Sequence, residues 1–304
     1  MKQTWISLLA GVLLAHWTQA EIPRAHIPAA AKWVVDIKVD QFKKTDLGKF
    51  FLGQMAKNSS GLAELKKELQ FDPHTDLDRI TMFGFSKEPD ESIVLIKGKF
   101  KHDHLQAKLK QNEKYEARKA GSHTFHSWVD DAKRGGGPSH GCFYAKNIVL
   151  MGGNGNLLET AVKVLDGKAA SLKTQPGLPH PPLPKRPTFI TIAANLDELE
   201  EGGDGPGAAV LQNVQTLAFA AGQVQQNLWA QVGIIPDNAE AGKKIRDTLA
   251  GFLALAGLAE AEDPRMQQIT QLVKATKVEF KNGHVILSLD FPMAKLLDTL
   301  KAEQ

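Results

Sequence analysis

The sequence has very little cysteine: Cys142 is the only one in 304 residues. A single thiol excludes an internal disulfide, so a chain of this length must be stabilised by a buried core. The sequence also has little net charge. Outside its first twenty residues it carries 36 basic and 34 acidic residues, a net charge of +2. Because nucleic-acid binding requires a clearly basic surface, this balance argues against DNA or RNA as a partner.

Long hydrophobic runs are scarce too, and after residue 20 none is long and apolar enough to predict a membrane span. In the first twenty residues, Lys2 precedes an apolar run from Trp5 to Leu14, and Thr18-Gln19-Ala20 places small residues at the two positions that a signal peptidase reads. A short membrane anchor is the alternative, but no basic stop-transfer cluster follows. We therefore predict a signal peptide over residues 1–20 and an exported, soluble protein, either secreted or in a bacterial periplasm, which fits the lack of disulfides.

Prolines are concentrated in one segment, TQPGLPHPPLPKRP, at residues 174–187. Six prolines in fourteen residues remove backbone donors, so the segment favours an extended, semi-rigid connector. We predict a proline-rich linker over residues 169–187, between an N-terminal α+β half at 31–168 and a C-terminal α+β half at 188–304.

Each half repeats one local pattern, in which a β-hairpin leads into an amphipathic helix. In the clearest copy, apolar residues alternate on both sides of Asn282-Gly283, a dipeptide typical of two-residue hairpin turns. Further copies are predicted at 79–111, at 142–165 with Asn154 or Asn156 as the helix cap, and at 216–258 with Asp237 or Asn238 as the cap. Two units in each half indicate an internal duplication.

The order of these units predicts the fold class. Single strands are expected to open the halves at 33–39 and 189–194, and two helices are expected at 46–57 and 62–70. Hairpins keep neighbouring strands antiparallel, and the helices that follow them cover a face of the sheet. The predicted fold is therefore α+β, with two related antiparallel sheets that are each backed by helices.

One predicted helix differs from the others, because Ile245 to Leu258 (IRDTLAGFLALAGL) is apolar nearly all round. A fourteen-residue helix is too short to cross a membrane. Helices that are apolar on every side are usually interior, so burial between the two halves is expected. The alternative is that this helix contacts a partner protein.

The N-terminal half contains five histidines that are weak candidates for metal ligands: His102, His104, His123, His126 and His140. If residues 122–129 form a strand, His123 and His126 point to opposite faces of the sheet and cannot bind one ion. The first two histidines flank a predicted helix start, where an i, i+2 pair points apart. No HxxxH, HExxH or CxxC spacing occurs, so neither a metal site nor any other cofactor is predicted with a defined ligand set.

Cys142 follows GGGPSHG, which is predicted to link two strands, so that Cys142 opens the second strand as a half-buried residue. Nothing nearby predicts the electropositive surroundings that lower a thiol pKa. The segment GGNGN at 152–156 lacks both the GxGxxG and the P-loop spacing, and no GxSxG or SxxK motif occurs. The sequence therefore shows no catalytic constellation, and we do not predict an enzyme.

Three segments carry a diffuse resemblance: CFYAKNIVLMGGNGNLLETAVKVL, LWAQVGIIPDNAEAGKKIRDTLAGFL and VEFKNGHVILSLDFPMAKLLDTL. In these segments the chain resembles a loose group of exported bacterial proteins of unknown function that are built from duplicated hairpin–helix units. The resemblance covers most of the mature chain and implies no activity and no catalytic residues.

Three functions remain open at this point. The first is a non-enzymatic protein-binding or scaffold module that uses the apolar helix Ile245–Leu258. The second is a carrier of an apolar small molecule or lipid, held between sheet and helices near Leu253, Leu255 and Leu258. The third is a metal-binding protein or metal-dependent hydrolase that uses the five histidines. The absence of a catalytic set favours the first.

Overall fold

The computed structural model describes residues 22–58, 60–129, 137–180, 182–197, 212–258 and 264–302. The predicted signal peptide at 1–20 lies outside these residues. Within the described ranges, no helix has the length and apolarity to cross a membrane.

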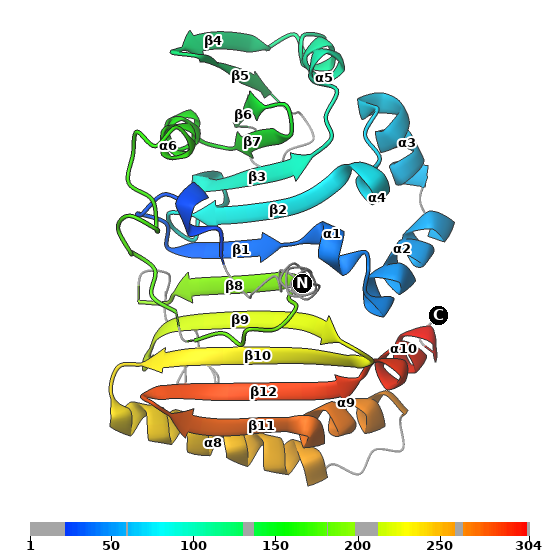
Figure 1. Cartoon of the computed structure of the whole chain (residues 1–304), viewed down its shortest axis with the longest axis vertical. Coiled ribbons are helices and arrows are strands. Elements are labelled where there is room, and N and C mark those ends of the chain that lie inside the picture. The colour runs from blue at the N-terminus through cyan, green and yellow to red at the C-terminus, as the bar shows by residue number, and fades with distance from the viewer. Residues whose placement is uncertain are drawn as a thin grey trace, which may run out of the picture.

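The chain folds into a mixture of helices and antiparallel strands, which confirms the predicted α+β class (Figure 1). The strands of the N-terminal half are β1 (Trp33–Ile37), β2 (Leu77–Gly84), β3 (Ser92–Gly98), β4 (Glu116–Ala120), β5 (His123–Val129), β6 (Pro138–Ala145) and β7 (Ile148–Gly152). Those of the C-terminal half are β8 (Ile190–Asn195), β9 (Val214–Val224), β10 (Asn227–Pro236), β11 (Thr276–Lys281) and β12 (His284–Pro292).

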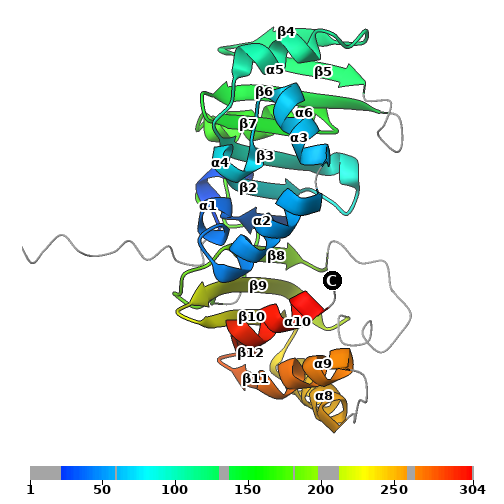
Figure 2. The same cartoon turned by 90° about the vertical axis from the view of Figure 1, so that its right-hand side faces the viewer.

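The helices follow or connect these strands. The α-helices are α1 (Val39–Phe42), α2 (Asp46–Asn58), α3 (Ser60–Leu69), α4 (Pro73–Asp76), α5 (His102–Leu109), α6 (Gly155–Leu165), α8 (Ala239–Leu258), α9 (Pro264–Ala275) and α10 (Met293–Ala302). Short 3-10 helices are η1 (Arg24–His26) and η2 (Pro89–Glu91). Helices α1 to α5 gather along one end of the strands, and α8 and α9 lie together on one side of the C-terminal strands (Figure 2).

The expectation of two separate sheets is wrong, because the strands form one twelve-stranded sheet in the order β11-β12-β10-β9-β8-β1-β2-β3-β7-β6-β5-β4. The two halves join where β1 pairs with β8, from Trp33 opposite Ala194 to Ile37 opposite Ile190. Each half alone would leave a strand with unpaired backbone groups at this edge, and the pairing satisfies both edges.

Outward from this junction the two halves have the same strand order. The N-terminal half runs β1, β2, β3, β7, β6, and the C-terminal half runs β8, β9, β10, β12, β11. In both halves a helical segment follows the third strand, which is β3 or β10. A later hairpin, β6–β7 or β11–β12, then places its second strand beside that third strand. The N-terminal half also carries the hairpin β4–β5 at its outer edge. This common order is what an internal duplication would produce, and the duplication stays a prediction.

The two halves bury their largest clusters on opposite faces of the sheet. In the N-terminal half, Val34 and Phe83 pack with Leu158 of α6 and are fully buried. In the C-terminal half, Ile234 and Val285 pack with Ile245 of α8. The strand register shows this, because Val34 lies in one row of directly opposite residues with Gly233 and Ile286. These two residues are the chain neighbours of Ile234 and Val285. Since adjacent residues of a strand point to opposite faces, the second cluster lies on the other face of the sheet from Val34.

The proline-rich segment is packed against the molecule. Leu172 and Leu178 are fully buried in the N-terminal cluster. Arg24 of η1 donates hydrogen bonds from Nε to the Leu172 carbonyl at 3.2 Å and from Nη1 to the Leu178 carbonyl at 3.1 Å. The segment then crosses the front of the sheet in Figure 1 before it enters β8. Its prolines therefore connect the halves along the sheet surface.

Several helix caps and one hairpin turn lie at residues that the sequence predicted. Asn154 is the cap of α6, since its side chain accepts from the Asn156 and Leu157 amides at 3.0 and 3.3 Å. Asn238 is the cap of α8 and accepts from the Ala241 amide at 2.9 Å. In the turn between β11 and β12, Asn282 and Gly283 have φ values of 52° and 78°, as a type I′ hairpin requires.

Candidate functional site

Helix α8 is attached to the sheet by one face of its first half. Gly242 lies so close to Phe280 that a Cβ atom there would come within 2.3 Å of the phenyl ring. One turn later Ile245 is 3% exposed and packs against Val285, and Leu249 packs at the margin of the same cluster. The spacing of these residues by three or four places one stripe of α8 on the strands β10, β12 and β11.

The second half of α8 projects its apolar side chains into solvent. Residues Thr248–Leu258, which we call the apolar end of α8, contain no charged residue. Phe252 is 46% exposed, Leu255 68% and Leu258 77%. The expectation that this helix is buried between the halves is therefore wrong. It lies against β11, the edge strand farthest from the β1–β8 junction on this side.

The charged side chains of α8 lie before the apolar end. Lys244 Nζ, for example, forms an i, i+4 ion pair of 3.0 Å with Glu240. On the side toward α9, Gly257 approaches Lys274, with 3.7 Å between an added Cβ and the lysine Cγ. At Gly251, by contrast, an added Cβ would meet nothing within 4 Å. The apolar end of α8 is thus open to solvent at Gly251 and has the charged residue Lys274 beside it at Gly257.

Of the three leucines that the carrier hypothesis names, Leu253 is half-buried, whereas Leu255 and Leu258 are mostly exposed and do not line an enclosed space. Other exposed large apolar side chains are Phe51 and Met55 of α2, both 43% exposed, and Met151 of β7 at 37%. The apolar end of α8 combines three such residues within seven positions. Contiguous exposed apolar surface of this kind usually marks an interaction site.

The five candidate histidines lie in separate surroundings. His104 Nε2 lies 2.8 Å from the Glu68 carbonyl, and His123 Nε2 lies 3.0 Å from Asp166 Oδ1. The ring of His140 lies against Gly155, 3.2 Å from where a Cβ would be. Among the described residues, no group of three His, Cys, Asp or Glu side chains is arranged to hold a metal ion.

His126 and His102 belong to an aromatic cluster on the sheet face opposite Cys142. The ring centroids of His126 and His102 lie 5.1 and 4.9 Å from that of Phe143. His126 is 3% exposed, and its Nδ1 lies 2.8 Å from the Tyr115 hydroxyl. Burial, helped by the charge of Lys110, lowers the pKa of His126, so the ring is held neutral. This arrangement is one of packing, and the rings serve the core.

Cys142 lies within β6 and is 1% exposed, more deeply buried than the half-buried position expected. The strand begins at Pro138, so His140 and Gly141 belong to it and not to the link. Burial, with a smaller effect of Asp166, raises the pKa of the thiol to about 11. A thiol that is buried and protonated is not a nucleophile at neutral pH.

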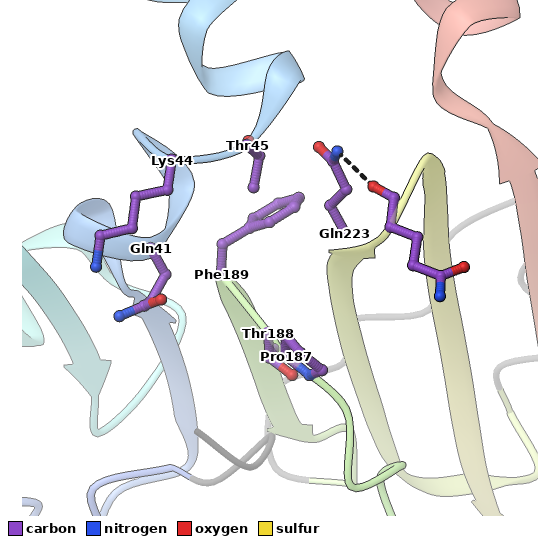
Figure 3. A pocket seen from close by; sticks show the side chains of 8 residues that line it. Gln41, Lys44, Thr45, Pro187, Thr188, Phe189 and Gln223 are labelled. Atoms are coloured by element: carbon purple, nitrogen blue, oxygen red, sulfur yellow. Dashed lines mark hydrogen bonds between the residues drawn. The ribbon is translucent and has the colours of Figure 1, made fainter. Parts of the chain in front are cut away.

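A crevice also lies beside the junction of the two halves (Figure 3). Gln41, Lys44 and Thr45 lie on one side of Phe189 and Gln223 on the other. Gln223 is already bonded to Asp46, accepting from its amide at 2.9 Å and donating to its carboxylate at 2.8 Å. The cavity of about 200 Å³ is below the usual size of a ligand site. The bonds between Gln223 and Asp46 hold the start of α2 against β9.

Comparison with known proteins adds information on the fold. No protein-family model matches the sequence, and no curated protein matches it either. Among solved structures, crystal form III of TP0453 aligns with a TM-score of 0.51 at 8% identity, over 93% of this chain and 98% of that chain. The chain is similar in fold to TP0453. Crystal forms IV and I of TP0453 align with TM-scores of 0.46 and 0.45, at 8% and 9% identity, over 94% and 93% of this chain and 98% and 97% of theirs.

Proposed function

We propose that this chain is an exported, non-enzymatic protein-binding module, and that the apolar end of α8 inserts into an apolar groove of a partner protein. The exposure of Phe252, Leu255 and Leu258 on an uncharged helical segment is the observation that carries the proposal. The signal-peptide pattern of residues 1–20 supports the export.

The spacing of these three residues supports a helix-in-groove contact. Residues three apart lie on adjoining positions of one helix face, so Phe252, Leu255 and Leu258 form a row of anchors. Ala254 and Ala256 lie between them and are exposed, as is Gly251 just before them, which allows the walls of a groove to approach the helix backbone. A row of anchors with little bulk around it fits a concave apolar partner surface.

The position of the helix supports the proposal as well. Its first half is fixed on the sheet through Gly242 and Ile245, so the second half is presented without a large loss of conformational freedom. Because the apolar end carries no charge, burying it leaves no unpaired charge in the interface.

The test uses the mature chain, tagged at its C-terminus and purified gently from the exported fraction of its own source. The co-purifying partner is identified, both proteins are purified, and the dissociation constant is measured by calorimetry for wild type, Phe252→Lys/Leu255→Lys and Met151→Lys. Since central anchors contribute about 2 kcal/mol each, the double variant is expected to bind about 1,000-fold more weakly. Met151→Lys places the same charge on an exposed apolar residue of β7 and is expected to bind as wild type does.

Light scattering and thermal unfolding of each variant alone establish that the fold is unchanged. The proposal is overturned if the chain remains a strict monomer with no partner, if it forms only a homodimer, or if it binds lipid vesicles in place of a protein. It is also overturned if the double variant and Met151→Lys bind the partner equally well.

A further inference from the structure

The C-terminal half has a groove on the sheet face opposite α8. Its floor is formed by β10, β12 and β11, and one wall is the end of the proline-rich segment at Pro184 and Arg186. The cavity measures about 420 Å³, which is within the range of small-ligand sites.

The floor of the groove is a straight row of polar residues across three strands. Gln231 of β10 lies opposite Ser288 of β12, which lies opposite Lys277 of β11. Directly opposite residues share a face of the sheet, and strands are about 4.8 Å apart, so the row extends over about 10 Å. Asp290 lies opposite Trp229 in the next row of the same face.

The proline-rich wall is fixed to this floor by several contacts. Gln231 Nε2 donates to the Pro182 carbonyl at 3.1 Å, and Trp229 Nε1 donates to the Pro187 carbonyl at 2.9 Å. The guanidinium of Arg186 lies 6.0 Å from the centroid of the Trp229 ring and 3.4 Å from Asp290 Oδ2. The wall, including its cation, is therefore held in place before any ligand binds.

Some of the polar groups that line this groove already have hydrogen-bond or ion-pair partners, and others have none among the described residues. Asp290 already accepts from Arg186 and, through Oδ1, from Asn227 Nδ2 at 2.7 Å. In the part of the chain that the structure describes, the Lys277 ammonium and the Ser288 hydroxyl have no hydrogen-bond or ion-pair partner, and the carboxamide oxygen of Gln231 accepts no bond. Two donors and one acceptor thus stand in one row.

We propose that this groove, which we call the Lys277 groove, binds a small organic carboxylate that carries an amide N–H, such as an N-acyl amino acid or the C-terminal residue of a peptide. The carboxylate accepts hydrogen bonds from Lys277 and Ser288, and the amide N–H donates to Gln231. Arg186 on the opposite wall is paired with Asp290, so Lys277 supplies the positive charge that favours an anion. The site lies on the other face of the sheet from α8, so it is independent of the protein-binding surface.

The test follows the Trp229 indole N–H and the amides of β11 and β12 by NMR while N-acetylglycine is added at low ionic strength. Wild type is expected to show saturable shifts. Lys277→Met is expected to raise the dissociation constant at least about tenfold, the effect of losing a charged hydrogen bond. Lys281→Met, which removes an exposed lysine from the same strand and face, is expected to bind within twofold of wild type.

Matched probes separate the chemistry from general charge attraction. N-Acetylglycinamide has the amide without the carboxylate and is expected to cause no saturable shift. N-Acetyl-triglycine binds more tightly than N-acetylglycine if the source is a peptide end, and equally if it is a small molecule. The proposal is wrong if N-acetylglycine causes no shift, if the neutral amide or inorganic phosphate binds as well, or if Lys277→Met and Lys281→Met behave alike.

Discussion

Arg79 of β2 holds the fully buried carboxylate of Asp36 of β1 in a bidentate ion pair, with Nε–Oδ1 and Nη2–Oδ2 distances of 2.7 Å each. The Thr81 hydroxyl donates to the same carboxylate at 2.8 Å. Asp36 lies opposite Thr191 of β8, so this charge is buried beside the strand pair that joins the two halves. The stability of the junction depends on how this single carboxylate is paired.

Arg79→Met is expected to lower the free energy of unfolding by about 3–5 kcal/mol, because it leaves a buried charge without its partner. Asp36→Leu/Arg79→Met removes both charges and is expected to cost clearly less. Urea unfolding monitored by circular dichroism measures both. Lys244→Met, which breaks an exposed ion pair, is the control and is expected to change stability by less than about 1 kcal/mol. A double variant less stable than Arg79→Met would contradict the interpretation.

The buried ring of His126 predicts a loss of stability in mild acid. Its pKa in the folded state is lowered, mainly by burial, below the ordinary value of about 6.5, so the unfolded chain takes up the proton first as the pH falls. The contribution of His126 is therefore complete above pH 6.5 and declines below it, until the folded state is protonated as well. Urea unfolding at pH 7.5 and 5.0 is expected to show this decline.

His126→Gln is expected to reduce the decline, since a glutamine can still accept from the Tyr115 hydroxyl but does not titrate. Burial and the charges of Arg79 and Lys97 also lower the pKa of His26, so His26→Gln is expected to remove a further part of the stability loss in acid. An identical decline in wild type and in the combined His26→Gln/His126→Gln variant would exclude both histidines as its source.

Cys142 is expected to resist thiol reagents as long as the chain is folded. With a pKa of about 11 the thiol is deprotonated in only about one molecule in a thousand at pH 8, and its 1% exposure blocks access. Labelling with a disulfide reagent is expected to proceed at the rate of unfolding, and within seconds in 6 M guanidinium. Because the chain has no other cysteine, the signal is unambiguous. Rapid labelling of native protein would show that β6 opens locally.

Replacing glycine by alanine is expected to have opposite effects on stability at Gly53 and at Gly283. At both Gly53 and Gly283 an added Cβ would meet nothing within 4 Å, so contacts do not distinguish them. Gly53 lies inside α2, and Gly53→Ala is expected to stabilise the protein by about 0.5–1 kcal/mol. Gly283 has a φ of 78°, and Gly283→Ala is expected to cost about 1–2 kcal/mol. Thermal unfolding of the two variants measures the difference in sign.

Elements with a strong local signal were predictable from the sequence. The turn at Asn282-Gly283 and the caps Asn154 and Asn238 belong to motifs that require only neighbouring residues. Strand β4 (EARKA) was missed because three of its five residues are charged and no apolar alternation reveals it. Helix α9 (PRMQQITQLVKA) was also missed, although Met266, Ile269, Leu272 and Val273 recur at the spacing of an amphipathic helix.

Long-range relations were not predictable in the same way. The pairing of β1 with β8 joins residues more than 150 positions apart, and no local pattern reports it. The apolar nature of α8 was evident from the sequence, but its exposure was not, because a helix that is apolar all round has the same pattern when it is interior. The row of Lys277, Ser288 and Gln231 exists only once three strands are in register.

The continuous sheet predicts that the two halves unfold as one unit. Strands β2 and β3 lie on one side of the β1–β8 junction and β9 and β10 on the other, with backbone pairing unbroken between them. Arg79 and the carboxylate that it binds both belong to strands of the N-terminal half, β2 and β1. If the sheet unfolds cooperatively, hydrogen exchange of the most protected amides in β9 and β10 of Arg79→Met is expected to report the same loss of free energy as in β2 and β3. Independent halves would leave β9 and β10 unaffected. Gly283→Ala is the reciprocal test, since it acts in the C-terminal half and is expected to lower the protection of β2 and β3 by its full cost.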